Sequence, residues 1–158
     1  MADKEHTLEI IHELVQICKD GETGYAHAAG IVQAPGLKPY FKEESLERSR
    51  FVQELTEMAQ HLGENPEASG SVAGTLHRVW IAAKADIGLG DQSVLNSVEQ
   101  GEDAAKKAYE KALSAELLPE ARSLVQRQAK SIFTAHDYVR DLRDKKTAAE
   151  STREDKVA

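Results

Sequence analysis

The sequence predicts an all-α fold, and three observations support this prediction. Apolar residues recur at steps of three and four along several long segments, which is the period of an amphipathic helix. The four prolines and ten glycines lie mostly at the ends of these segments. The alternation of apolar and polar residues that is typical of half-buried strands is absent. The expected architecture is therefore an antiparallel bundle of helices.

The first two helices are bounded by clear start and stop signals. The first is expected to begin at Thr7, a good N-cap residue, and to end near residue 34, because Pro35 and Gly36 follow. The second is expected to follow Pro39 and to end near residue 62, before a glycine and an Asn-Pro pair.

Three further helices are expected in the second half of the chain. A short helix should cover about residues 72–87, after the small-residue loop PEASGS. The next should cover about residues 92–115, after the break GLGDQS. The last should begin at Pro119, because proline suits the first turn of a helix, and should run to about residue 143.

The domain organisation follows from these boundaries. A chain of 158 residues is about one domain, and residues 7–143 are expected to form it. Residues 1–6 are expected to be flexible, and residues 144–158, which carry no apolar stripe, are expected to be a disordered tail.

The position of the short helix predicts the topology. The four long helices have roughly 22 to 28 residues, or about 33 to 42 Å at 1.5 Å per residue. The short helix falls between the second and third of them, where a long connection lets the second pair of helices run in the sense of a crossover bundle. This order favours a ferritin-like four-helix bundle over a simple up-and-down meander.

The composition limits the partners and the compartment. The net charge of −7 argues against nucleic acid or an anionic membrane as a partner. No apolar run approaches the roughly 20 residues that span a bilayer, and the charged N-terminus predicts a cytoplasmic protein. The single Cys18 fits a reducing compartment, and its place on an apolar stripe predicts a buried thiol. A homodimer through an exposed apolar helix face is compatible with this fold.

Carboxylates interrupt the apolar stripes of two helices. Val94, Val98, Ala105 and Tyr109 share one face of the fourth helix, and Glu102 completes that face. On the first helix, Glu22 completes the stripe in the same way. A buried carboxylate costs several kcal/mol unless it is paired or coordinated, and two that face each other also repel. A cation between them would remove both costs.

A bound metal is one candidate for this cation. Di-iron and di-manganese bundles take single glutamates from two helices and Glu-x-x-His pairs from the other two. Glu22 and Glu102 would be the single, bridging carboxylates. The paired positions are incomplete, because Glu54 and Glu57 stand on the second helix and His136 stands without an acid on the fifth. His136 and Asp137 are not expected to act as a metal ligand and its orienting partner, because adjacent helical residues point about 100° apart.

An ion pair is the other candidate. Glu22 and Glu102 would then pair with cationic side chains across the bundle, for which the fifth helix offers Arg122, Arg127 and Lys130. His136 would be a hydrogen-bonded core histidine.

Four segments of the chain, CKDGETGY, LHRVW, EQGEDAAKKAY and AHDYVRDLRD, carry a family resemblance. They resemble the bacterial ferritin-like family catalogued as domain of unknown function 2383, over about residues 7–143. The resemblance implies a ferritin-like fold and a metal centre, but no established reaction. The residues to which it points are Asp20, Glu22, Tyr25, His77, Trp80, Glu99, Glu102, Asp103, His136 and Asp137.

Two functions are therefore expected as alternatives. The first is a ferritin-like protein with a di-iron or di-manganese centre that serves a bacterial stress response. Its metal ligands would come from Glu22, Glu54, Glu57, Glu99, Glu102 and His136. The second is a metal-free helical bundle that acts as a structural or protein-interaction module.

Overall fold

The computed structural model describes residues 2–65 and 90–157, which form four α-helices and no strand. The helices are α1 (Lys4–Ile31), α2 (Leu37–His61), α5 (Asp91–Ser114) and α6 (Pro119–Val157). The all-α prediction is confirmed for these residues. The short helix expected at 72–87, with His77 and Trp80, lies outside the described residues. No helix of the described part of the chain is long and apolar enough to cross a membrane.

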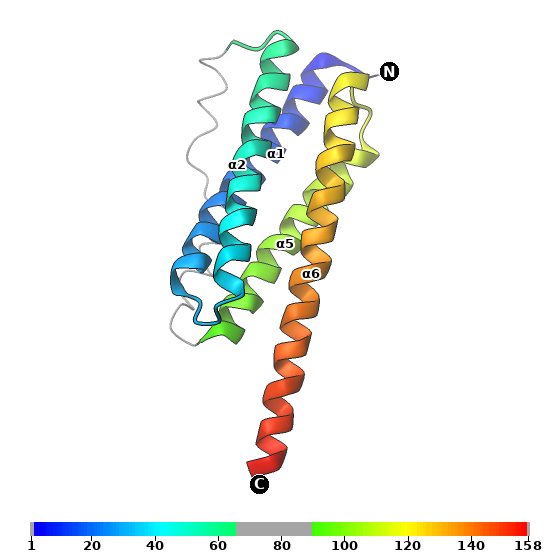
Figure 1. The fold of residues 1–158 in the computed structure, drawn as a ribbon. Coiled ribbons are helices and arrows are strands. Elements are labelled where there is room, and N and C mark those ends of the chain that lie inside the picture. The colour runs from blue at the N-terminus through cyan, green and yellow to red at the C-terminus, as the bar shows by residue number, and fades with distance from the viewer. Residues whose placement is uncertain (1, 66–89, 158) are drawn as a thin grey trace.

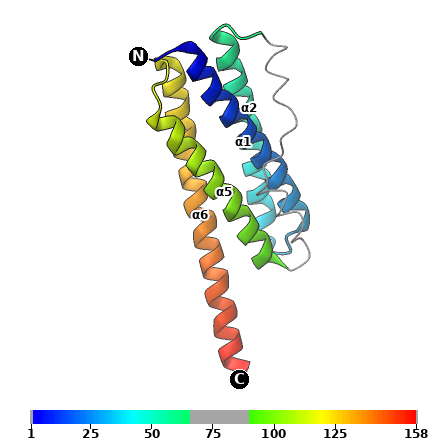
Figure 2. The ribbon, with the colours of Figure 1, turned by 180° about the vertical axis from the view of Figure 1, so that it is seen from behind.

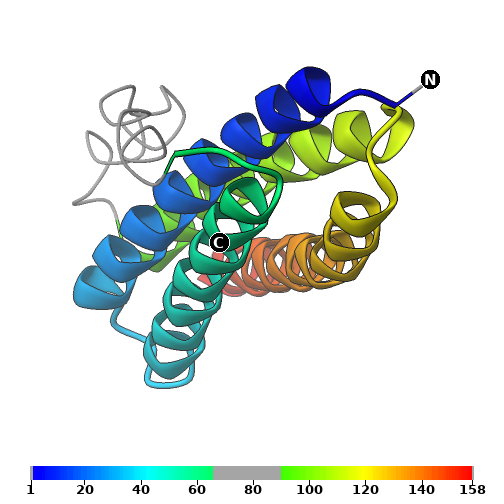
Figure 3. The same ribbon diagram turned by 90° about the horizontal axis from the view of Figure 1, so that it is seen from above.

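The helices are arranged as two hairpins (Figure 1). In this view α1 runs downward and α2 upward, while α5 runs upward and α6 downward, so α2 and α5 point in the same direction. α1 packs closely on α2 and on α5, and α5 packs closely on α6, as the view from above also shows (Figure 3). α2 and α6 contact each other only slightly.

The apolar core is divided into two clusters. One joins Ile11, Leu14 and Cys18 of α1 to the second half of α2, the second half of α5 and the first half of α6. The other contains Tyr25 of α1 together with Phe41, the start of α5 and Val139. On α2 and α5 the residues between the two clusters include Arg48 and Glu102, both buried. A polar layer thus crosses the middle of the bundle.

The ends of the first helix differ from the sequence prediction. α1 begins at Lys4, and its N-cap is Asp3, whose carboxylate accepts a hydrogen bond from the His6 backbone N–H at 2.7 Å. Thr7 lies inside the first turn, where its hydroxyl donates to the Asp3 carbonyl. The prediction that Thr7 is the N-cap was therefore wrong, because an equally good cap precedes it.

The loop after α1 is held by the start of α5. The Asp91 carboxylate accepts hydrogen bonds from the backbone N–H groups of Gln33 and Ala34, both at 2.8 Å. These two donors follow the last helical turn, so Asp91 fixes the chain where it leaves α1. The two hairpins are joined at this end of the bundle.

The last helix extends beyond the other three, as both side views show (Figures 1 and 2). It continues to Val157, whereas the sequence analysis expected a disordered tail from residue 144. The segment DKKTAAESTREDKV contains no proline or glycine and is rich in good helix formers. A helix that is already nucleated by packing can propagate through such a segment without an apolar stripe.

Candidate functional site

The centre of the bundle holds a buried carboxylate with two partners. Glu102 of α5 has no exposed surface. Its Oε1 accepts a hydrogen bond from the Tyr25 hydroxyl of α1 at 2.6 Å and another from Nη2 of Arg48 of α2, also at 2.6 Å. The cation that neutralises Glu102 is thus a guanidinium from a third helix. Neither group is hydrated, so their close contact has to offset the free energy lost when both charges leave water.

Neighbouring residues of α1 hold Arg48 in this position. It is 1% exposed, and its guanidinium lies 5.4 Å from the centre of the Tyr25 ring. Gly21 of α1 faces it, and a β-carbon at Gly21 would lie 3.0 Å from Arg48 Nη1. Position 21 lies seven residues after Leu14 and four before Tyr25, on the buried face of the helix. A β-carbon at position 21 would press against the arginine side chain, so the glycine makes room for it.

The protonation states of the pair support an ionic contact. Burial lowers the pKa of Arg48, but Glu102, Tyr25 and other nearby acids raise it by more, so the guanidinium remains charged. Burial, with the charge of Glu102, raises the pKa of Tyr25 well above its ordinary value. The phenol therefore keeps its proton and remains a donor to Glu102.

A second carboxylate shares the same guanidinium. Glu44 of α2 lies one turn before Arg48, with its Oε2 3.8 Å from Arg48 Nη2 and its side chain 13% exposed. Burial raises the pKa of Glu44 to about 7; Arg48 opposes this shift, and the charges of Glu47 and Glu102 add to it. Among the described residues, three buried atoms of this group have no hydrogen-bond partner: Glu44 Oε2, Arg48 Nε and Glu102 Oε2. Two carboxylates thus face one guanidinium.

A second buried chain of hydrogen bonds links all four helices. The Tyr109 hydroxyl of α5 donates to Gln128 of α6 at 2.7 Å, and the Cys18 sulfur of α1 lies 3.2 Å from the same hydroxyl. Gln128 in turn donates to Glu54 of α2 at 3.2 Å. Burial raises the pKa of the Cys18 thiol to about 11, so it is a protonated structural group and not a nucleophile.

The six predicted metal ligands do not come together. Glu54 pairs with Arg127, Glu57 accepts from Gln53, and Glu99 pairs with Arg143. Glu22 is half-buried at the margin of the stripe, because Gly21 takes the fully buried place beside Arg48. In the parts of the chain that the structure describes, no group of three His, Cys, Asp or Glu side chains is close enough to hold a metal ion. This donor set does not fit a di-metal centre.

His136 lies in a separate ion-pair cluster. Its Nε2 is 2.6 Å from Asp103 of α5, and its Nδ1 is 3.1 Å from Asp137. Adjacent helical residues point about 100° apart, yet the exposed Asp137 carboxylate still reaches the His136 ring. Both ring nitrogens therefore have carboxylate partners, and the cluster ties α5 to α6.

Arg48 is the residue that sequence reasoning missed. Ion pairing was one of the two alternatives for Glu102, but the expected cations, Arg122, Arg127 and Lys130, lie on the fifth expected helix, which is α6. There, Arg122 bonds the carbonyls of Leu113 and Ala115, and Arg127 pairs with Glu54. The signal for Arg48 was present, since Phe41, Arg48, Phe51, Leu55 and Ala59 form the buried face of α2 at helical spacing.

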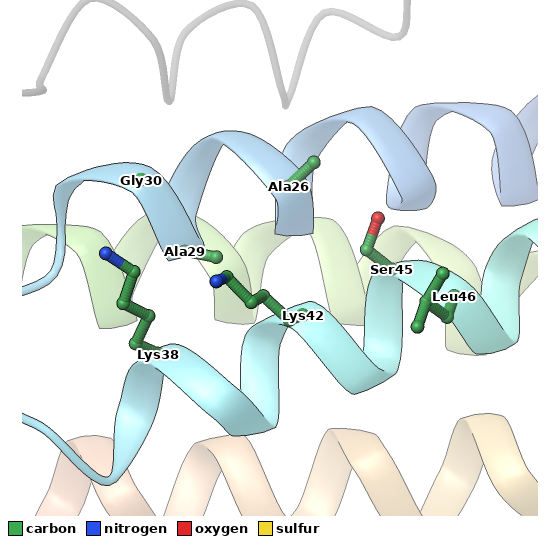
Figure 4. A pocket seen from close by; sticks show the side chains of 7 residues that line it. All are labelled: Ala26, Ala29, Gly30, Lys38, Lys42, Ser45 and Leu46. Atoms are coloured by element: carbon green, nitrogen blue, oxygen red, sulfur yellow. The ribbon is translucent and has the colours of Figure 1, made fainter.

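A shallow hollow on the outside of the bundle lies between α1 and α2 (Figure 4). It has a volume of about 520 Å³, and Lys38 and Lys42 reach across it from α2 toward Ala29 and Gly30 of α1. None of its lining residues belongs to the buried atoms that lack a hydrogen-bond partner. This hollow therefore offers less chemistry than the centre of the bundle.

The close approach of Gly21 to Arg48 leads to a first prediction. Gly21→Ala should lower the free energy of unfolding by about 1 to 3 kcal/mol, because the new methyl group overpacks a buried guanidinium. The matched control is Gly30→Ala in the same helix, where nothing lies within 4 Å of the added atom. That change should stabilise by up to about 1 kcal/mol through helix propensity. Urea melts measure both; equal effects would contradict the packing of Arg48 on Gly21.

A family model described as Domain of unknown function (DUF2383) matches residues 6–115. The match includes Tyr25, Arg48 and Glu102, and it ends before α6. No curated protein matches the chain.

Proposed function

The chain belongs to the family described as Domain of unknown function (DUF2383), and we propose its function from its own geometry because that description names no activity. The proposed function is that of a ferritin-like helical bundle that works without a metal, as a structural or protein-interaction module. The observation that carries this proposal is the Arg48–Glu102 pair. The guanidinium stands at the middle of the bundle, where di-metal bundles hold their ions between inward carboxylates.

The directions of the helices support the ferritin-like part of the proposal. α2 and α5 run in the same direction, so α2 ends at the opposite end of the bundle from the start of α5 (Figure 1). One long crossover between two antiparallel hairpins is the topology of ferritin-like bundles.

The buried polar groups support a structural role. A buried ion pair adds little net stability compared with apolar packing, but it penalises arrangements in which either partner is left alone. Arg48, Tyr25 and Glu102 come from three different helices, so their contact fixes the rotation of α1, α2 and α5 relative to one another. The pair thus favours one packing of the bundle over its alternatives.

The part of α6 that extends beyond the other helices supports an interaction role. It presents a helical surface that no other described helix covers (Figures 1 and 2). A partner protein, or a second copy of the chain, would find this surface accessible.

Metal loading tests the proposal. Protein stripped with a chelator and then dialysed anaerobically against Fe(II) or Mn(II) should retain far less than one metal ion per chain by elemental analysis. A di-metal centre would retain about two. The control is Glu102→Gln, which should take up as little metal as the wild type. Stoichiometric metal that is lost in Glu102→Gln would contradict the proposal and support the di-iron or di-manganese alternative.

A further inference from the structure

The slight contact between α2 and α6 leaves an open groove of about 550 Å³ between them. Its volume falls in the range of small-ligand sites. Tyr40, Glu44 and Glu47 of α2 form one wall. The other wall is formed by α6, from Arg127 to Tyr138.

The two walls of this groove carry opposite charges. The α2 wall presents the carboxylates of Glu44 and Glu47, and the α6 wall presents Lys130 with the hydroxyl-bearing Ser131 and Thr134. Arg127 is already paired with Glu54. Among the described residues, no ion pair joins Lys130 to either glutamate. The acidic and basic walls of the groove therefore do not neutralise each other directly.

The α2 wall of the groove contains a buried acceptor atom that lacks a hydrogen-bond donor. Glu44 Oε2 is buried and has no hydrogen-bond partner among the described residues, and its 3.8 Å separation from Arg48 Nη2 is too long for a hydrogen bond. Buried polar atoms are rarely left unsatisfied, and those that are call for an explanation. This oxygen faces Arg48 and is closed to solvent, so a ligand ammonium group in the groove would meet the remaining, partly exposed side of the Glu44 carboxyl group.

One end of the groove is aromatic. The rings of Tyr40 and Tyr138 lie 4.6 Å apart at an angle of 55°, and Tyr138 is 47% exposed. Such rings provide an apolar surface for a side chain or an aromatic ring, with hydroxyl groups at the edge.

We propose that the groove between α2 and α6 binds a small zwitterion, an α-amino acid with an apolar or aromatic side chain. Its ammonium group bonds Glu44 and Glu47, its carboxylate pairs with Lys130 and the Ser131 hydroxyl, and its side chain rests on Tyr40 and Tyr138. This site goes beyond the proposed function and does not depend on the absence of a metal.

The surroundings of Glu44 predict how binding depends on pH. The charged groups around it are Arg48, Glu47 and, with the smallest effect, Glu43 of α2, Glu102 of α5, and Lys130 and Arg127 on the α6 wall; α1 contributes the neutral phenol of Tyr25. Since the pKa of Glu44 is raised to about 7, a ligand ammonium group has to displace its proton below that pH. The affinity should therefore fall about tenfold between pH 8 and pH 6, in line with one proton per binding event.

Isothermal titration calorimetry of the full chain with three matched compounds tests the proposal. Phenylalanine should bind, whereas 2-phenylethylamine, which lacks the carboxylate, and 3-phenylpropionate, which lacks the ammonium group, should bind at least about tenfold more weakly, a difference of 1.4 kcal/mol. Absence of phenylalanine binding up to about 10 mM, a concentration above the weakest affinities usual for such sites, would overturn the proposal. Equal binding of 2-phenylethylamine would also overturn it, because the groove would then be a simple cation site.

Variants locate the binding in the groove. Glu44→Gln and Lys130→Met should each weaken phenylalanine binding at least about tenfold, and Glu44→Gln should also remove the pH dependence. The controls are Glu43→Gln and Lys107→Met, exposed residues that do not line the groove. They should bind like the wild type. Circular dichroism confirms that each variant is folded, and unchanged binding in folded Glu44→Gln would overturn the assignment.

Discussion

Glu102→Gln is expected to destabilise the metal-stripped protein by about 3 kcal/mol, at the lower end of the 3 to 5 kcal/mol that follows loss of one partner from a buried pair. The amide keeps the shape of the side chain and can still accept the Tyr25 hydrogen bond. It leaves Arg48 charged, 1% exposed and without its closest carboxylate. The effect stays at the lower end because Glu44 is 3.8 Å away and can ionise to compensate. Denaturant melts at neutral pH measure the change.

The metal-site alternative predicts the opposite sign for the same variant. If Glu102 and Glu22 faced each other across an empty metal position, removal of one charge would relieve repulsion and stabilise the metal-stripped protein. The control is Glu110→Gln, an exposed glutamate of the same helix. It should change the stability by no more than about 0.5 kcal/mol.

Glu44→Gln is expected to make the protein more stable than the wild type at pH 8 but not at pH 5. Burial raises the pKa of Glu44 from 4.5 to about 7, so between these values the folded state holds a proton that the unfolded state has released. The wild type therefore loses stability as the pH rises through this window, by about 2 to 3 kcal/mol if the shift is fully expressed. Glutamine does not titrate and escapes this loss.

Urea melts of the wild type and of Glu44→Gln at pH 5 and pH 8 measure this difference. Glu43→Gln is the control, because Glu43 is the neighbouring acid on the exposed side of α2. A stability gap that stays constant with pH would contradict the burial of the Glu44 carboxyl group.

Much of the fold could be predicted from the sequence because helices are local. The apolar period gave four long helices, and the prolines and glycines placed most of their ends within a few residues. Start and stop signals are weaker guides, since Asp3 and Thr7 are equally plausible N-caps and tertiary contacts decide between them. α6 continues past residue 143, where its apolar stripe ends, because a helix can extend without such a stripe.

The polar layer could be predicted only in part. Periodicity indicated that Glu102 points inward, since that depends on the phase of one helix. Its partner depends on the register and rotation of a second helix, and no single-helix pattern contains that information. Arg48 shares the buried face of α2 with Phe41, Phe51 and Leu55, but a charged side chain at such a position does not by itself indicate that it is buried.

The partners of Glu54 and His136 could not be predicted for the same reason. Glu54 meets Arg127 of α6, and His136 meets Asp103 of α5, across helix interfaces that are far apart in sequence. The six candidate ligands were inferred helix by helix, and such patterns do not reveal that Glu54, Glu99 and His136 pair with residues of other helices.

The Arg48 guanidinium neutralises Glu102 in the middle of the bundle. A double-mutant cycle in metal-stripped protein tests it most directly, with Arg48→Met, Glu102→Gln and the double variant compared by denaturant melts. Each single change should destabilise, and the double variant should lose clearly less than the two losses added together, with a coupling energy of about 2 kcal/mol or more. Additive losses, or a Glu102→Gln variant that is more stable than the wild type, would contradict the claim.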